Sequence, residues 1–390
     1  MRFVMFYHSL ISDWNHGNAH FLRGVVTELL ARGHEVSVYE PRHNWSLKNL
    51  LLNHGEEAIQ DFQSAYPHLK STPYDAAELD LHAISEAADV VIVHEWNDHD
   101  VVRRLGEVRA KNPRFKLLFH DTHHRSVTQR ESMAAYDLKH YDGVLAFGGV
   151  IRDLYLSEKW ARRAWTWHEA ADTRIFRPRW TEHFDGDLVW IGNWGDDERT
   201  AELHEFLLGP VKRLGLKARI YGVRYPEHAK QALRDAGIEY GGWLPNFKAP
   251  EAFARYRVTV HVPRRPYMQA LPGIPTIRPF EALACGIPLI SAPWQDSENL
   301  FEPGKDFLIA QNGRDMDLKL ATVLRDGGVA RQLALHGLRT IQQRHTCAHR
   351  VDELLKILDE IEVSRPRLRR AQAKRIVRRR ALGSRKAVGV

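Results

Sequence analysis

The chain has 390 residues, is 44% hydrophobic and 27% charged, and carries a formal net charge of +7. This composition is ordinary for a globular protein and excludes a fibrous or wholly disordered chain, while the length predicts two domains. Residues 365–390 contain 11 lysines and arginines and no acidic residue, so the rest of the chain carries about −4 and the positive charge belongs to the tail.

The first part of the chain alternates predicted strands and helices. Arg2–His8 is the first expected strand, and a polar loop follows it. Ala19–Arg32 carries a helical apolar stripe that ends at Gly33, and Glu35–Tyr39 is the next strand. We expect one or two helices within residues 44–68, and strands at residues 89–93, 115–119 and 143–147. This order predicts a parallel sheet, with ligands bound at the carboxyl ends of its strands.

A second cycle of the same kind begins near residue 186. We expect strands at residues 187–192, 218–221 and 258–262, helices at residues 198–208 and 228–236, a helix–strand unit at residues 279–290, and a final helix at residues 348–363. The sequence therefore predicts an α/β protein with two doubly wound, Rossmann-like halves that are split near residue 172.

The most informative stretch is Thr276–Asp296, TIRPFEALACGIPLISAPWQD. An apolar run opens with Arg278 and Glu281, Gly286 ends it, and an apolar strand follows. The amides of the loop before this helix, together with the positive end of the helix dipole, predict an anion site.

This stretch resembles the donor half of GT-B nucleotide-sugar glycosyltransferases, of the family-four and spore-maturation types grouped as glycosyl transferases group 1. In that family an Arg-x-Phe-Glu-Ala-x-Ala-Cys-Gly run is typical, and residues 278–286 match it. Residues 166–178, TWHEAADTRIFRP, resemble the crossing between the two domains, with Glu169-Ala170-Ala171 in place of the usual Asn-Gly-Val. Residues 240–246, YGGWLPN, resemble a turn of the same families.

The resemblance implies a GT-B fold, in which two Rossmann-like domains face a cleft. We expect an acceptor-side domain at residues 1–168, an inter-domain crossing at 169–178, a nucleotide-sugar domain at 179–345, a return helix at 346–364 and a basic tail at 365–390.

Donor-binding residues follow from the same resemblance. Glu281 matches the glutamate that accepts hydrogen bonds from the ribose hydroxyls, whereas Gly273 stands where the family has a first glutamate. Arg278 is placed to neutralise a diphosphate leaving group. The other candidates in the donor half are Ile274, Thr276, Trp243, Asn193, Arg199 and Arg264.

Histidines end two predicted strands of the first half. His94 precedes Glu95-Trp96 and resembles the sugar-facing histidine of starch and glycogen synthases, and His120, Asp121 and His123 end the next strand. These four residues are the catalytic candidates, because imidazole can hydrogen-bond a sugar hydroxyl or move a proton. A zinc site is the alternative for this cluster, but the HExxH spacing is missing and we expect no metal.

The loop after the first strand supplies the acceptor-side candidates His16, Gly17 and Asn18. It resembles the glycine-bearing loop that faces the donor diphosphate in GT-B proteins. Asn18 is equally suited to cap the helix that follows.

We therefore expect an enzyme, a hexosyl- or glycosyltransferase that moves a sugar from a nucleoside diphosphate to an acceptor hydroxyl without a metal or other cofactor, the nucleotide sugar being a co-substrate. Retention of the anomeric configuration and a part in bacterial-type glycan or cell-surface polysaccharide synthesis are what the resemblance implies. The acceptor is a glycan, a lipid-linked molecule or a protein. Two alternatives stay open: a sugar-nucleotide epimerase of the same fold, and a non-catalytic binding protein that uses its basic tail on membrane or nucleic acid.

Location and surface partners follow from simpler signals. The N-terminal MRFVMFYHSL has no small-residue cleavage site, and Cys285 and Cys347 form neither a disulfide framework nor a metal-ligand pair. No apolar run approaches the ~18 residues of a transmembrane helix. We expect a cytoplasmic protein, held at the inner face of a membrane by residues 365–390, since basic residues bind anionic lipid. The sequence does not indicate an oligomeric state.

Overall fold

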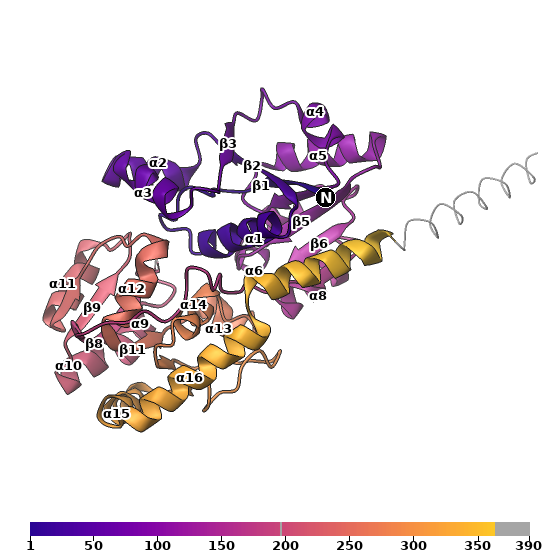
Figure 1. Ribbon diagram of the computed structural model, residues 1–390. Coiled ribbons are helices and arrows are strands. Elements are labelled where there is room, and N and C mark those ends of the chain that lie inside the picture. Colours follow the sequence, from indigo (N-terminus) through magenta and orange to yellow (C-terminus); the bar gives the residue numbers. More distant parts are fainter. Residues whose placement is uncertain (196, 363–390) are drawn as a thin grey trace, which may run out of the picture.

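The computed structural model describes residues 1–195 and 197–362, and these ranges form two α/β halves that face each other (Figure 1). The basic segment at residues 365–390, and with it the predicted membrane-binding surface, lies outside the described residues. No helix in the described ranges is both long enough and apolar enough to cross a membrane.

The first half is built on a parallel sheet with the order β3-β2-β1-β4-β5-β6-β7. Its strands are β1 (Arg2–Phe6), β2 (Glu35–Pro41), β3 (Ser71–Tyr74), β4 (Val90–His94), β5 (Lys116–Asp121), β6 (Gly143–Ala146) and β7 (Ala164–Thr166). The helices between them are α1 (Ala19–Ala31), α2 (Trp45–His54), α3 (Glu57–Ala65), α4 (Leu81–Glu86), α5 (His99–Lys111), α6 (Arg125–Thr128), α7 (Arg130–Ala134) and α8 (Gly149–Ser157).

The second half repeats this order with six strands in its described residues, β10-β9-β8-β11-β12-β13, again all parallel. Its strands are β8 (Gly186–Ile191), β9 (Ala218–Tyr221), β10 (Ile238–Tyr240), β11 (Tyr256–His261), β12 (Leu289–Ser291) and β13 (Leu308–Ile309). Its helical segments are α9 (Thr200–Leu203), η1 (His204–Leu208), α10 (Gly209–Leu214), α11 (Glu227–Asp235), η2 (Asn246–Lys248), α12 (Ala249–Ala254), α13 (Arg265–Gln269), α14 (Ile277–Ala284), α15 (Gly313–Arg325) and α16 (Gly327–Arg344).

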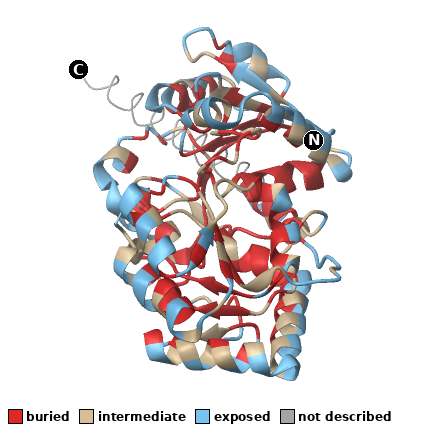
Figure 2. Cartoon of the chain, turned by 90° about the vertical axis from the view of Figure 1, so that its left-hand side faces the viewer, coloured by how far each residue is buried: buried red, intermediate tan, exposed pale blue. Residues whose placement is uncertain are grey.

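Both halves thus follow the doubly wound order, in which the first three strands extend the sheet to one side and the fourth strand starts its extension to the other side of the first strand. The predicted α/β class with two Rossmann-like halves is confirmed. The central strands β1, β4, β8 and β11 are mostly buried because helices cover both faces of each sheet. Figure 2 shows the buried residues gathered in the interior of each half, with exposed faces on the outer helices.

One predicted helix is longer than expected. The helix at residues 198–208 was expected to end before Gly209-Pro210, but the chain stays helical to Leu214. Pro210 lies in the first turn of α10, where a missing N–H is tolerated, and a π-helical turn precedes it. A Gly-Pro pair therefore marks a change of helix type here and not an end.

A final helical segment, residues 347–362, returns from the second half to pack on the first (Figure 1). The indole Nε1 of Trp167 donates to the carbonyl of Arg350 at 2.8 Å, and Trp165 Nε1 donates to Glu360 at 2.9 Å. Ion pairs of Asp352 with Arg32 and of Glu362 with Lys116 extend the contact. The chain therefore crosses between the halves twice.

Candidate active site

A cavity of about 710 Å³ lies between the two halves, and we call it the cleft. This volume is in the range that holds a small ligand or cofactor. Its walls are loops that follow the carboxyl ends of strands in both sheets, where doubly wound proteins bind ligands. The first-half wall is formed by His8, Asp13, Asn15, His16, Gly17, Asn18, Trp45, Trp96, Thr122, His123, His124, Gln129 and Phe147.

The loop between β1 and α1 is held rigidly in this wall. The buried guanidinium of Arg23 donates to the carbonyls of Leu10 and Ile11 at 2.8 and 2.6 Å and forms an ion pair with Asp13 at 2.9 Å. Glu40 accepts from the amide of Leu10 at 2.6 Å. This bonding fixes the backbone that presents the predicted residues His16, Gly17 and Asn18 to the cleft.

The same loop ties the two halves together. The carboxylate of Asp13 accepts from Trp243 Nε1 at 3.1 Å and from the amide of Asn246 at 3.0 Å, both in the second half. Asn15 accepts from the side chain of Asn193. Because these partners also line the cleft, the loop sets the distance between its walls.

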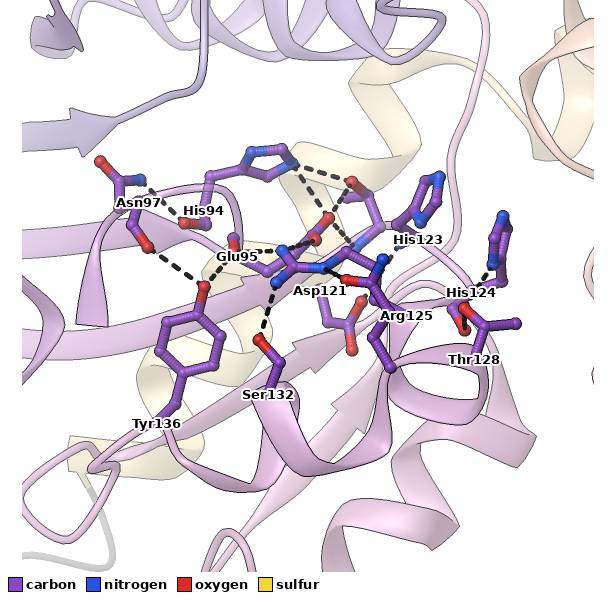
Figure 3. A network of polar contacts seen from close by, with 12 residues as sticks. His94, Glu95, Asn97, Asp121, His123, His124, Arg125, Thr128, Ser132 and Tyr136 are labelled. Carbon is purple, nitrogen blue, oxygen red and sulfur yellow. Dashed lines mark hydrogen bonds and ion pairs between the residues drawn. The ribbon is translucent and has the colours of Figure 1, made fainter. Parts of the chain in front are cut away.

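Three of the four predicted catalytic residues at the ends of β4 and β5, namely His94, Asp121 and His123, belong to one network of polar contacts (Figure 3). The register pairs His94 with His120, so the two strand ends do meet. Nε2 of His94 lies 2.8 Å from the hydroxyl of Thr122, which also donates to Glu95 at 3.0 Å. Asp121 accepts from Tyr155 at 3.0 Å.

Burial decides the charge of these groups. It raises the pKa of the Glu95 and Asp121 carboxyls and lowers that of the imidazoles of His94 and His120. Among the four catalytic candidates, His123 lines the cleft, while His94, His120 and Asp121 are fully buried behind Thr122.

His120 has an apolar setting. Neither ring nitrogen has a hydrogen-bond partner, and the ring lies 6.1 Å from Phe21 and 4.8 Å from Trp167, measured between centroids. The predicted cluster thus contains both cleft-facing and core residues.

Three of the predicted arginines meet in the second-half wall. Arg199 donates to the carbonyls of Val262 at 2.9 Å and Asn193 at 2.5 Å, and its guanidinium lies 5.0 Å from the ring centre of Trp190. Arg264 and Arg278 also line the cleft. Burial and then the charge of Arg264 lower the pKa of Arg199 to about 9. An anion in the cleft would relieve this repulsion between cations.

The N-terminus of α14 opens onto the same wall, and its backbone is strained. Thr276, which precedes the helix, has φ 61° and ψ 176°, a region that is populated almost only by glycine. Asn15 and Arg224 also line the cleft with positive φ. Such strain costs on the order of 1–3 kcal/mol per residue and tends to cluster at functional sites.

Glu281, the predicted ribose ligand, is fully buried and does not line the cleft. One carboxylate oxygen accepts from Asn246 at 2.9 Å and lies 3.0 Å from Nδ1 of His20, and the other forms an ion pair with Arg278. Burial alone would raise the pKa of this carboxyl, but Arg278, His20 and Asn246 together hold it below its usual value.

The remaining predicted donor residues are spread around the second-half wall. Asn193 and Trp243 line the cleft, and Trp243 packs against His54 with 4.3 Å between ring centroids. Ile274 is buried against the first half, and Gly273 has φ 87° and no room for a Cβ beside Glu298. Glycine is therefore required by the backbone at position 273.

Glu169 is a cleft residue that the sequence did not mark as functional. It lies in the crossing between the halves, is almost fully buried and lines the cleft, and its Oε1 has no hydrogen-bond partner. Burial, and next the charge of Glu281, raise the pKa of its carboxyl well above the usual range. The only sequence signal was the departure from the Asn-Gly-Val pattern at residues 169–171.

Other buried polar atoms of cleft residues also lack hydrogen-bond partners: His16 Nε2, His123 Nδ1, His124 Nε2, Arg199 Nε, Asn246 Oδ1 and His261 Nε2. Buried polar atoms in folded proteins are almost always bonded, so a cluster of unbonded ones at one cavity indicates a polar ligand. In the described ranges, no three His, Cys, Asp or Glu side chains are grouped so that they could hold a metal ion.

A family described as glycosyl transferase-like matches residues 199–356. No curated protein matches this chain. Sucrose-phosphate synthase from Thermosynechococcus elongatus is 13% identical, with 93% of this chain and 100% of that chain covered and a TM-score of 0.65.

Two further structures carry nucleotides. Anabaena HepE in complex with UDP-glucose is 12% identical, with 92% of this chain and 100% of that chain covered and a TM-score of 0.65. An alpha-glucosyltransferase in complex with UDP-glucose and DNA containing an abasic site is 12% identical, with 92% of this chain and 99% of that chain covered and a TM-score of 0.66.

The fold is that of the GT-B glycosyltransferases, and the family match places a glycosyl transferase-like sequence in the second half. The resemblance to GT-B glycosyltransferases, which the sequence indicated most specifically at residues 166–291, is thereby confirmed. The expected class of enzyme, a glycosyltransferase, is confirmed as well.

Proposed function

We propose that the chain transfers a sugar from a UDP-sugar to an acceptor hydroxyl in the cleft, without a metal, in the synthesis of a bacterial-type glycan or cell-surface polysaccharide. The observation that carries this proposal is the asymmetry of the cleft walls. The second half contributes Arg199, Arg264 and Arg278 and the N-terminus of α14, which together suit a diphosphate. The solved structures with UDP-glucose support uracil as the base.

The chemistry follows from this placement. The acceptor oxygen bonds to the anomeric carbon as the bond from that carbon to the β-phosphate oxygen breaks. The diphosphate keeps the electron pair and takes up the proton of the acceptor hydroxyl. The three arginines stabilise the charge that develops on the diphosphate, the role that a metal fills in other enzymes. We propose that the anomeric configuration is retained, which proton NMR of the product would show.

Binding of UDP tests the arginine wall. A charge-assisted hydrogen bond contributes about 1.5–3 kcal/mol, so Arg264→Ala and Arg278→Ala should each weaken UDP binding by about 10- to 100-fold in calorimetry. Arg331→Ala, on the exposed surface of α16, is the matched control and should bind UDP as the unaltered protein does. Unchanged affinity in both wall variants would contradict the proposal.

Product analysis separates transfer from epimerisation. Incubation of the full chain with UDP-glucose and a glycan acceptor should yield UDP and a lengthened glycan in mass spectrometry. An epimerase would give an altered sugar without any acceptor, and a binding protein would give no product. Either result would replace the transferase proposal.

We further propose that the protein works in the cytoplasm at the inner face of a membrane, held by residues 365–390. Each basic residue near an anionic surface contributes about 1 kcal/mol. Deletion of these residues should abolish binding to phosphatidylserine vesicles and leave UDP binding unchanged. Equal vesicle binding by both forms would exclude the tail as the anchor.

A further inference from the structure

The first-half wall of the cleft exposes two large aromatic rings. Trp45, at the start of α2, is 42% exposed, and Trp96, after β4, is 39% exposed. His8 lies between them, with its ring centroid 6.4 Å from that of Trp45 and 5.8 Å from that of Trp96. All three line the cleft. Two exposed indole rings in one cavity form an apolar patch with polar tips, which suits a ligand that has both apolar faces and hydroxyls.

Both tryptophans are held in fixed orientations. Trp14 packs edge-on against Trp45 at 5.3 Å between centroids. The guanidinium of Arg125 lies 4.5 Å from the centre of the Trp96 ring and donates to the carbonyl of Glu95 at 3.1 Å and to Gln129 at 3.0 Å. The rings thus form a preorganised platform.

Imidazoles surround this platform. Burial lowers the pKa of His8 to about 4 and holds those of His16 and His123 well below their usual value, so all three are neutral at physiological pH. Nε2 of His16, itself more than nine-tenths buried, and Nδ1 of His123 have no hydrogen-bond partner. A neutral imidazole offers one donor and one acceptor, and a sugar hydroxyl, which both donates and accepts, can bond to either.

Charge separates this wall from the opposite one. Among the described residues that line the cleft, every arginine comes from the second half: Arg199, Arg224, Arg264 and Arg278. In the first-half lining, Asp13 is the one charged side chain, and it is bonded to Arg23, Trp243 and Asn246. Among the described residues of the first half, no lysine or arginine lines the cleft to pair with a phosphorylated or otherwise anionic acceptor.

We propose that Trp45 and Trp96 form the acceptor subsite and that it takes a neutral sugar ring, stacked on an indole, with its hydroxyls bonded by His16 and His123. The inference rests on the proposed transferase function and narrows its acceptor to an uncharged glycan. The flat apolar faces of a pyranose suit indole, and its hydroxyls suit the unbonded imidazole nitrogens.

A glycan array tests the class of acceptor. The full chain, saturated with UDP, is applied to neutral, phosphorylated, sulfated and sialylated oligosaccharides, with a single-stranded DNA oligonucleotide as a further probe. We expect binding to neutral glycans. Preference for any of the anionic probes, or no glycan binding by protein that does bind UDP, would overturn the subsite. Failure to bind UDP would instead refute the transferase proposal, and this inference would fall with it.

Variants locate the subsite. The neutral glycan that binds best should bind about tenfold more weakly to Trp45→Ala and to Trp96→Ala, while UDP affinity, which reports correct folding, stays the same. Trp96→Phe keeps an aromatic ring and should retain most of the binding. Trp180→Ala removes a tryptophan that is 82% exposed away from the cleft and should change nothing. Equal glycan affinity in Trp45→Ala, Trp96→Ala and Trp180→Ala would place the acceptor elsewhere.

Discussion

Glu169 shows how one residue can adapt the cleft to an anionic ligand. Its carboxyl is buried beside Glu281 and Arg278, and burial raises its pKa, so the neutral form is favoured. A neutral carboxyl can donate a hydrogen bond to a phosphate or a sugar, whereas an ionised one would repel the diphosphate. An asparagine at this position would be neutral at every pH, whereas Glu169 is neutral only while it is protonated. The protonation state of Glu169 is therefore the property to test.

Because burial raises the pKa of Glu169 well above the usual range of a carboxyl, we predict that UDP affinity falls as the pH rises and Glu169 ionises, and that Glu169→Gln flattens this dependence. Glutamine copies the shape and donor of the neutral acid, so affinity at the lower pH should be unchanged. Calorimetry at several pH values measures both effects. Glu251→Gln, on the exposed side of α12, is the control. An equal pH slope in Glu169→Gln and the unaltered protein would contradict this role.

At the scale of elements, the loop between β1 and α1 connects the two sheets. Its Asp13 carboxylate is 5% exposed and faces the fully buried Arg23, and it also accepts two hydrogen bonds from the second half. Lys248 and Asp61 form another ion pair between the halves, but its side chains are 45% and 44% exposed. Removing one partner of a buried ion pair leaves the other charge buried without a partner, whereas an exposed ion pair contributes little to the free energy of unfolding.

Asp13→Ala should therefore lower the free energy of unfolding by about 3–5 kcal/mol, and Asp61→Ala by less than about 1 kcal/mol. Urea unfolding followed by circular dichroism gives both values. Similar losses in the two variants would mean that the loop is not the main polar link between the halves.

How far the sequence could predict these elements depended on their length and burial. The apolar runs of β1, β4, β5 and β6 stand out because their strands are covered on both faces. The strands β7 and β13, of three and two residues, give no periodic signal and were not predicted. The polar-rich helices α15 and α16 were also missed.

The site was predicted to the level of the loop and not of the side chain. Polar residues at the end of β5 were expected at the cleft. Thr122 and His123 do line it, whereas His120 is fully buried in the core. Thr122 and His123 follow the last residue of β5, so which side chains face the cleft depends on the backbone of this loop and on how the second half packs, neither of which a linear pattern encodes. Trp45 and Glu169 were missed for the same reason, since their neighbours come from distant segments.

At the scale of the whole molecule, burial of histidine makes folding depend on pH. Ten histidines have a pKa lowered chiefly by burial: His8, His16, His34, His54, His94, His120, His123, His124, His261 and His345. A histidine whose pKa is lowered on folding takes up its proton more readily in the unfolded chain. The free energy of unfolding therefore decreases as the pH falls from about 6.5 toward the pKa of the folded state. The raised carboxyls Glu95, Asp121, Glu169 and Asp296 act in the opposite direction but are fewer.

We predict that the urea midpoint falls between about pH 7 and about pH 5. His120, with a pKa lowered to about 3, alone accounts for about 2 kcal/mol at pH 5. His120→Phe removes an imidazole that has no hydrogen-bond partner and should reduce the loss by about that amount. A midpoint that does not change with pH, or the same dependence in the variant, would contradict the assigned protonation states.

The central claim is that the cleft between the two halves binds a nucleoside diphosphate through its second-half wall. A thermal-shift series of the full chain with UDP, GDP, ADP and CDP tests it most directly, because a ligand that binds the folded state raises its stability by about 2.7 kcal/mol at 100 times its Kd. We predict a saturable rise in Tm with UDP that Arg278→Ala reduces and Arg331→Ala does not. No shift with any nucleoside diphosphate, or an equal shift in both variants, would contradict the claim.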